Sequence, residues 1–510
     1  MGCWRFDSNN PTSTWRLLIP LYLIPSESRY LNYGIGGCVW VCLQVLLCVK
    51  CLTQDGVVYT VLCLGKTPED FYMNFVNSAP SNHLPEPTLY LGQHPNQPIQ
   101  LYRGFAELVK DEQVIEGQAT VSFGWFPSPC VKFEFTHFTE ARIDIDWDDV
   151  TLKLTEIGIS VKVRISQTTS WGNHRSIISG YPCEAIVKGK GHELTSLVFH
   201  LPNFPFFDIF NTWGMSEEGE EKELGGWLEW VFDGQFVFQT GDWRIVLATL
   251  PGNWDIHELL QSQGGYSLTH ICKLERLDRT PFSMDDARDL LEAFSYYLSF
   301  ARGLWLAPML IAGFDAEGKQ VFEEWSACRA DSWQNTYTWF STDSTDLVET
   351  FPGFMRRWQD KNWRELVQDS IHWYVESKKQ AGGVNGAIVL QQAALERLAW
   401  VLLVEDKRSL SQNGFQKLPA ADQVRLLLSS LGIDLKLPTD LINLTQLANQ
   451  QNLVDGPQAI TEIRNAIVHP NPKNRHKGGG ASEKIRTEAW SVGLEYLELA
   501  LLKLFDYPYV

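Results

Sequence analysis

The sequence predicts an α+β multidomain protein in which a β-rich, sandwich- or barrel-like N-terminal region is followed by an all-α helical bundle. The chain has 510 residues, more than one hydrophobic core usually supports, so two or three domains are expected. Between about residues 118 and 249, short β-branched and aromatic runs are separated by Gly, Pro and Asn, a pattern typical of strands and turns. Beyond Phe351-Pro352-Gly353 the hydrophobic period lengthens from two residues towards the helical repeat, which indicates helices.

The first 72 residues are predicted to be a hydrophobic, Cys-rich extension. Six of the ten cysteines lie within the first 63 residues. The uncharged stretch 31–49 is near the lower length limit of a membrane-spanning helix, but it contains Asn32, Gln44 and three glycines. We therefore favour an upstream extension from a misplaced start codon over a membrane anchor through residues 31–49, and we expect a cytoplasmic protein. The pair Cys48-x-x-Cys51 lacks the second pair that a zinc site needs.

Residues 73–275 are predicted to form the β-rich domain. Its expected strands are Thr120–Phe126, Val131–Phe138, Thr151–Ile165, Tyr181–Val187, Leu194–Leu201, Trp227–Phe238 and Trp243–Leu250. Asp144, Asp146 and Asp148 alternate with apolar residues, so on a strand their carboxylates would share one face that could hold a divalent cation. A solvated strand face is the simpler interpretation, and we predict no metal and no cofactor.

Residues 276–350 are predicted to form a helix followed by a β-hairpin. Ser283 is a suitable N-cap, Asp286 lies three residues later, and an apolar-rich run extends to Leu304. The two strands of the hairpin are expected at Pro308–Phe314 and Lys319–Trp325.

Residues 351–510 are predicted to form the helical bundle. The expected helices are Trp363–Lys379, Ala387–Val404, Ala421–Leu431, Thr439–Leu447, a fifth helix ending at His469, and Ser482–Phe505. The fifth helix has Asp455 as its N-cap and Pro457 in its first turn. It is expected to end at His469 because the residue before a proline, here Pro470, disfavours the α conformation.

An arginine and a histidine stand five positions apart at the end of this fifth helix, in the run Arg464-Asn465-Ala466-Ile467-Val468-His469. Ending the helix at His469 lets both side chains face one cleft. RNA cleavage by an internal 2′-hydroxyl needs a proton acceptor, a proton donor and positive charge on the phosphate. Histidine can transfer protons near neutral pH, and arginine can grip phosphate oxygens. Arg464 and His469 are therefore the candidate catalytic pair of a metal-independent endoribonuclease.

A short basic loop follows the pair and predicts local RNA binding. Its residues Lys473, Arg475, His476 and Lys477 precede three glycines and would attract an RNA backbone. The formal net charge of the chain is -18, so nucleic acid cannot bind over the whole surface. We expect RNA, and not DNA, as the nucleic-acid partner.

The run Arg464-Asn465-x-x-x-His469, in a helical domain ahead of a long terminal helix, resembles the R-N-x3-H motif of the HEPN superfamily, closest to its Apea-like domains. The resemblance covers residues 363–510. It implies an endoribonuclease that forms a homodimer with a composite site, in which Arg464 and His469 are catalytic and Asn465 supports them. It also implies a toxin or antiviral effector, restrained by an antitoxin or switched on by a phage-derived activator that an N-terminal domain senses.

Two alternatives stay open at this stage. The helical domain could be a catalytically inactive HEPN dimerisation or nucleotide-binding module, with Arg464 paired to an acid such as Glu462 or Glu488 and His469 bonded to the last helical carbonyls. The function would then lie in the β-rich region, as a ligand- or protein-binding domain.

Overall fold

The computed structural model describes residues 84–91, 93–137, 149–171, 175–207, 235–341, 345–469 and 482–508, and the backbone of four short strands nearer the N-terminus. These strands are β1 (Cys3–Arg5) paired with β2 (Arg16–Leu18), and β3 (Val49–Gln54) paired with β4 (Val57–Leu62). They belong to a unit that spans Met1–Ser81, and all further elements belong to a second unit, Asn82–Val510. Residues 31–48, which make up nearly all of the candidate anchor, lie outside the described residues.

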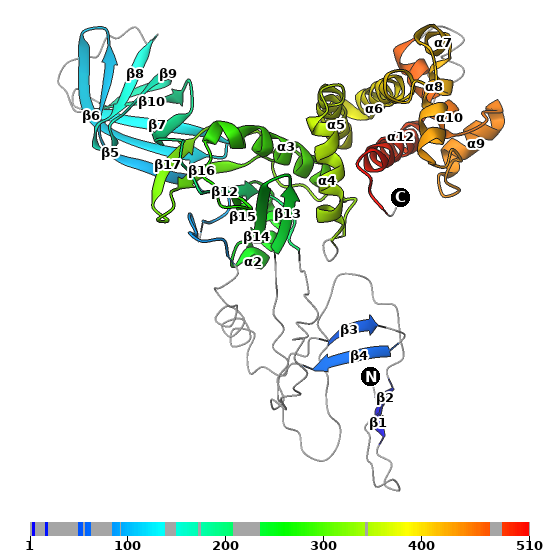
Figure 1. Ribbon diagram of the computed structural model, residues 1–510, viewed down its shortest axis with the longest axis horizontal. Coiled ribbons are helices and arrows are strands. Elements are labelled where there is room, and N and C mark those ends of the chain that lie inside the picture. The colour runs from blue at the N-terminus through cyan, green and yellow to red at the C-terminus, as the bar shows by residue number, and fades with distance from the viewer. Residues whose placement is uncertain are drawn as a thin grey trace. The chain divides into compact units, whose positions relative to one another are not determined.

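Six antiparallel strands of the second unit close into a barrel (Figure 1). In chain order they are β5 (Ile99–Lys110), β6 (Gln113–Gly124), β7 (Cys130–His137), β8 (Val150–Leu154), β9 (Ile159–Trp171) and β10 (Arg175–Pro182). Around the barrel the order is β10-β7-β6-β5-β8-β9. Burial alternates along the strands: in β7, Val131, Phe133 and Phe135 are buried while Glu134 is exposed. The two-residue repeat of a strand therefore fills the barrel with apolar side chains.

A seven-stranded sheet with the order β11-β17-β16-β12-β15-β14-β13 follows the barrel in the chain. Its strands are β11 (Ile186–Gly189), β12 (Ser196–Pro202), β13 (Gln235–Thr240), β14 (Trp243–Thr249), β15 (Leu268–Arg276), β16 (Met309–Phe314) and β17 (Gln320–Trp325). The central strand β12 is buried at every position, because both faces of the sheet are covered. Val198 packs into one core with barrel residues such as Phe123, whereas Leu197 and Phe199 pack into a second core with helical residues.

The helix α3 (Met284–Arg302) belongs to the second core, and its start confirms the predicted N-cap. The Ser283 hydroxyl accepts a hydrogen bond from the Asp286 N–H at 3.2 Å, and the Asp286 carboxylate accepts one from the Ser283 N–H at 2.8 Å. The predicted hairpin is β16 and β17, which lie within the large sheet. A shorter helix, α2 (Asn253–Gln263), separates β14 from β15.

Helices predominate in the described chain from Asp346 onwards. They are α4 (Asp346–Gln359), α5 (Arg364–Lys378), α6 (Gly383–Trp400) with its π-helical extension η3 (Val401–Asp406), α7 (Gln412–Gln416), α8 (Ala420–Leu431), α9 (Ile442–Gln451), α10 (Gly456–Val468) and α12 (Glu483–Leu504). The sequence predicted all of them except α4 and α7. Among the described residues, only the stretch Gly383–Asp406 is long and apolar enough to cross a membrane, and 61% of its apolar window is buried. It contacts α5, α8, α10 and α12, which is the position of a core helix in a bundle.

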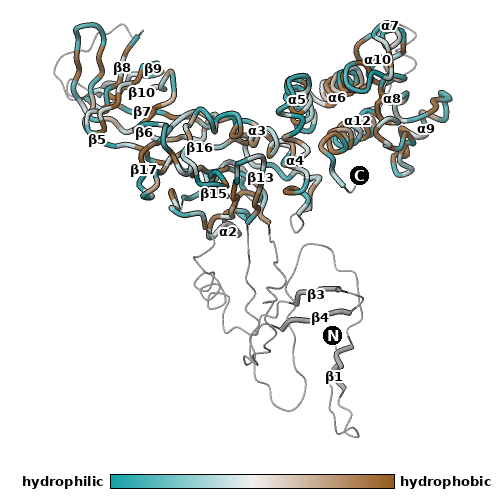
Figure 2. The backbone as a smooth tube through the Cα atoms, in the orientation of Figure 1, coloured by the Kyte–Doolittle hydropathy of each residue, from teal (hydrophilic) through white to brown (hydrophobic). Residues whose placement is uncertain are grey.

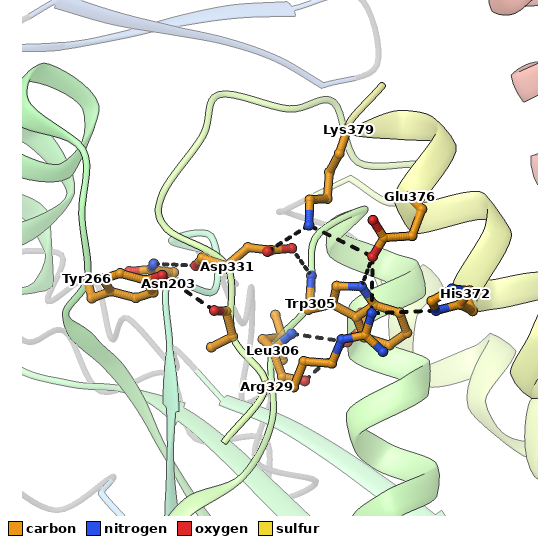
Figure 3. A network of polar contacts seen from close by, with 11 residues as sticks. Asn203, Tyr266, Trp305, Leu306, Arg329, Asp331, His372, Glu376 and Lys379 are labelled. Carbon is orange, nitrogen blue, oxygen red and sulfur yellow. Dashed lines mark hydrogen bonds and ion pairs between the residues drawn. The ribbon is translucent and has the colours of Figure 1, made fainter. Parts of the chain in front are cut away.

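A polar network joins the segment after the sheet to α5 (Figure 3). Asp331 accepts hydrogen bonds from the backbone N–H of Trp305 and from the ammonium group of Lys379, both at 2.8 Å. Glu376 accepts hydrogen bonds from the Trp305 indole at 2.6 Å and from Arg329 at 3.1 Å. Both carboxylates of this junction therefore have hydrogen-bond donors from other parts of the chain.

The predicted fold class is confirmed: a β-rich region precedes a helical one. Of the two architectures that the sequence left open, the structure has a barrel, and it adds an open sheet that the sequence analysis did not separate from it. Figure 2 shows hydrophilic and hydrophobic residues alternating along the barrel strands, as a filled barrel with a solvated outer face requires.

Candidate functional site

The candidate catalytic pair lies on α10 and at its C-terminal end. The helix begins where the Asp455 carboxylate accepts a hydrogen bond from the backbone N–H of Gln458 at 3.0 Å, with Pro457 in its first turn. Ile460 and Ile463 are buried, so this face holds α10 against the bundle. Arg464 follows Ile460 by about one helical turn and contacts α6, while His469 lies at the end of the helix.

His469 is the C-cap of α10. Its backbone angles, φ -119° and ψ 74°, lie outside the helical region, and its N–H donates to the carbonyl oxygen of Asn465 at 2.8 Å. The following proline accounts for this end, because it disfavours the α conformation in the residue before it. The side chain of His469 is exposed, so a substrate that reaches the end of α10 can contact the imidazole.

Arg464 is held between α10 and α6. Its Nη2 lies 3.3 Å from Oε1 of Glu396, and its Nη1 donates to Oδ1 of Asn465 at 3.1 Å. The side chain of Arg464 is 21% exposed, and its Nε is buried with no acceptor among the residues that the structure describes. The two contacts orient the guanidinium, and they leave some of its N–H donors unused.

A buried polar layer lies behind Arg464. The amide of Gln392 on α6 donates to Oε1 of Glu396 at 2.9 Å and to the Thr461 hydroxyl on α10 at 3.3 Å. Gln392 is 1% exposed and Thr461 is 4% exposed. Because buried polar groups are costly unless they are bonded, this layer fixes the register of α6 against α10 and holds Glu396 towards Arg464.

Several residues proposed from the sequence cannot be placed in this site. The predicted RNA-binding residues Lys473, Arg475, His476 and Lys477 lie outside the described residues, and so do Asp144, Asp146 and Asp148. Within the described part of the chain, no group of three or more His, Cys, Asp or Glu side chains is arranged to hold a metal ion.

The partner of Arg464 differs from the one expected. The sequence analysis named Glu462 or Glu488, but the structure pairs Arg464 with Glu396, and Glu488 instead accepts a hydrogen bond from the Leu444 N–H at the start of α9 at 2.6 Å. The signal for Glu396 was present in the sequence: it follows Gln392 by one helical turn in the predicted helix Ala387–Val404. Two polar side chains on the same face of a core helix indicate a polar partner.

The comparisons with known proteins cover most of the sheet and helical regions. Residues 189–336 match the family model described as the YopA central domain, and residues 360–509 match the one described as the YopA C-terminal domain. The SPbeta prophage-derived uncharacterized protein YopA of Bacillus subtilis (strain 168) is 26% identical over 385 residues, which are 74% of this chain and 83% of that protein. No solved structure matches the chain.

These matches correct the expected kinship with the HEPN superfamily, which is wrong. The match to the YopA C-terminal domain covers nearly all of the residues on which that resemblance rested, and no HEPN family matches. The motif fixes only three residues, and each has a role at an ordinary helix end: Arg464 pairs with a neighbouring helix, Asn465 bonds Arg464, and His469 is the cap. Dimerisation was expected from that resemblance alone, so it loses its support.

Proposed function

We propose that this chain is a cytoplasmic, metal-independent endoribonuclease that cleaves RNA at the C-terminal end of α10. Arg464 would bind the phosphate and His469 would transfer the proton. The barrel and the sheet would form the part that recognises a trigger or a partner, which a toxin or antiviral effector requires.

One observation carries the proposal: an oriented arginine with unused donors precedes an exposed histidine at the same helix end. The ion pair with Glu396 and the hydrogen bond to Asn465 position the guanidinium before any substrate arrives. The buried Nε of Arg464 has no acceptor among the described residues, and leaving such a donor unpaired destabilises a fold by about 1–3 kcal/mol. The Arg464 side chain is 21% exposed, so a phosphate would bind the outer N–H groups of its guanidinium and not the buried Nε.

The chemistry is transesterification within the RNA. The 2′-oxygen attacks the adjacent phosphorus and forms the O2′–P bond while the P–O5′ bond breaks. The imidazole of His469 accepts the 2′-hydroxyl proton, and the departing 5′-oxygen takes a proton from solvent. Arg464 would stabilise the charge that builds on the non-bridging oxygens. The products are a 2′,3′-cyclic phosphate and a 5′-hydroxyl.

A second candidate function follows from the same ion pair. If Arg464 and Glu396 only brace α10 against α6, the helical region is a scaffold, and the β-rich region binds a ligand or a protein. The side-chain exposures of 21% for Arg464 and 27% for Glu396 fit a partly buried structural pair as well.

The test is cleavage of total RNA by the purified full chain in EDTA. We expect wild type to cut and to leave 2′,3′-cyclic phosphate ends, and we expect Arg464→Ala and His469→Ala each to lower the rate at least about 100-fold. Circular dichroism and thermal unfolding check that both variants are folded.

The matched control for Arg464 is Arg397→Ala. Arg397 follows Glu396 directly on α6 and pairs with Glu365 on α5 at 2.9 Å, so its loss removes a comparable helix–helix ion pair. His192→Ala removes an exposed histidine far along the chain, whose side chain is 59% exposed. Intact RNA with wild type, or equal losses in the control variants, would support the scaffold function instead.

A further inference from the structure

We infer that the outer face of the barrel binds single-stranded nucleic acid through an aromatic–cation strip made of Phe126, Lys132, Arg164 and Tyr181. The strip lies on β7, β10 and β9, which are adjacent in the barrel, and on the loop that follows β6. It lies far along the chain from the α10 end, and binding there does not require that the chain cut RNA.

Tyr181 is the centre of the strip. It is 37% exposed, so part of its ring is accessible to a ligand. Directly across from it on β9 is Arg164, and on the other side the ammonium group of Lys132 on β7 lies 5.9 Å from its ring centroid. An exposed aromatic ring is thus flanked by a cation on each neighbouring strand.

The backbone next to Tyr181 is built for this arrangement. The pairing of β10 with β9 shifts register between Ser179 and Gly180, so the strands form a bulge just before Tyr181. A Cβ at Gly180 would lie 2.2 Å from the carbonyl oxygen of Arg164, so only glycine allows the strands to approach this closely. Bulges redirect the side chains beside them, and this one is next to the strip.

Phe126 extends the aromatic surface at the end of β6. Its ring is 52% exposed, and one edge contacts Tyr266 at a centroid distance of 5.7 Å. The ammonium group of Lys132 donates a hydrogen bond to the carbonyl oxygen of Phe126, which ties the loop to β7. Lys132 therefore contacts the ring of Tyr181 and the backbone of Phe126, so both exposed aromatic residues are next to the same lysine.

The charges favour a polyanion. Among the described residues neither Lys132 nor Arg164 makes an ion pair, although the chain carries a formal net charge of -18. The register continues from Lys132 to Ser122 on β6 and to Gln100 on β5, which are neutral hydrogen-bonding residues. The acidic neighbour, Glu134, is on the next outward position of β7.

Single-stranded nucleic acid can use both the aromatic rings and the cations of this strip. Bases stack on exposed aromatic rings, and the phosphates on either side of a stacked base need cations. An acidic peptide would use Lys132 and Arg164 but would leave the two rings exposed to water. The strip has no geometry that selects a base, so we expect binding without strong sequence preference.

The test measures fluorescence anisotropy of labelled 20-nucleotide uridine RNA, thymidine DNA and a polyglutamate peptide with the full chain carrying His469→Ala, so that cleavage cannot remove the probe. Adding Tyr181→Ala should weaken oligonucleotide binding roughly 5- to 100-fold. Adding Lys132→Ala together with Arg164→Ala should reduce the slope of log affinity against log salt by about 2. RNA and DNA arms show whether the sugar matters.

The controls come from the barrel and from β11 of the neighbouring sheet. Phe105→Ala removes another exposed barrel ring, at 64% exposure, and Lys153→Ala with Lys188→Ala removes two cations that have carboxylate partners. Both should change affinity less than about twofold. Absence of oligonucleotide binding at low salt, equal losses in the controls, or stronger binding of polyglutamate would overturn the inference, and none of these results bears on cleavage at α10.

Discussion

Two arginine–glutamate pairs of this chain have different surroundings. At the junction, Arg329 lies 3.1 Å from Glu376 and stacks 3.6 Å from the ring centroid of Trp305, whose indole bonds the same glutamate. At the end of α10, Arg464 lies 3.3 Å from Glu396, and its buried Nε has no acceptor among the described residues. At the junction, Glu376 accepts from both the Arg329 guanidinium and the Trp305 indole, while at the α10 end one buried guanidinium donor has no acceptor among the described residues. The presence of an ion pair does not distinguish a structural contact from a binding site. A guanidinium donor that has no acceptor among the described residues is the feature that distinguishes the two pairs.

The histidines show the same contrast. His270 in β15 is fully buried, hydrogen-bonds the Thr269 hydroxyl at 2.9 Å and stacks on Phe207 at a centroid distance of 4.9 Å. Burial lowers its pKa to about 3. His469 is exposed at a helix end. The sheet therefore holds its histidine neutral as a packing group, whereas the end of α10 presents one to solvent.

The largest expected effect concerns the buried histidines of the sheet, which acidification should destabilise. Burial lowers the pKa of His200 from 6.5 to about 4 and that of His270 to about 3. A depressed histidine pKa means that the unfolded chain binds the proton more tightly, so the stability is complete above pH 6.5 and is lost as the pH falls. Each histidine should cost roughly 1 kcal/mol per pH unit between pH 6.5 and its folded pKa. Urea unfolding at several pH values measures this.

The control for acidification is a pair of single variants. His200→Gln should flatten the pH dependence between pH 6 and 4, because one of the two groups no longer titrates. His192→Gln should leave it unchanged, since that side chain is 59% exposed. A wild-type stability that stays constant down to pH 4 would contradict the burial of these two rings.

The second effect separates the two arginines by stability. Arg329→Ala removes a cation–π contact and leaves Glu376 with one partner fewer, so we expect a loss of about 1–3 kcal/mol. Arg464→Ala also removes a buried donor that lacks an acceptor, which offsets the lost ion pair, so we expect a loss below about 1 kcal/mol. Urea unfolding of both variants measures the two losses in unfolding free energy. Equal losses would mean that the pair at α10 is a brace like the one at the junction.

Patterns among neighbouring residues predicted caps and helix ends, but they did not predict how the strands pair into a barrel and a sheet. The capping box at Ser283 and the helix end at His469 follow from neighbouring residues, and the structure has both. The strands β5 and β15 were not predicted. β15 is buried on both faces, so it lacks the alternation of a half-exposed strand. The division into a barrel and a sheet depends on pairings between distant strands, such as β12 with β16, which no local pattern contains.

The sequence suggested the two central residues of the candidate site but not their neighbours. Arg464 and His469 were identified because histidine and arginine suit phosphate chemistry, and their spacing is visible in one helix. Glu396 was missed because its contact joins residues 68 positions apart. Tyr181 and Phe126 were predicted only as strand residues and not as binding residues, since an exposed ring on a barrel and a buried one have the same sequence signature until the register is known.

The smallest expected effect distinguishes the negative charge of Glu396 from its ability to accept hydrogen bonds. Glu396→Gln keeps an oxygen that can accept from Gln392 and Arg464 but removes the negative charge, so unfolding free energy should change by less than about 1 kcal/mol. If Glu396 only orients Arg464 for RNA cleavage, the rate with Glu396→Gln should stay within about threefold of wild type, whereas Glu396→Ala, which frees the guanidinium, should lower it roughly tenfold or more. Single-turnover cleavage measures both variants. Equal losses in the two would show that the charge of Glu396 acts in the reaction itself, and the end of α10 would then hold an acid–base pair in addition to a phosphate clamp.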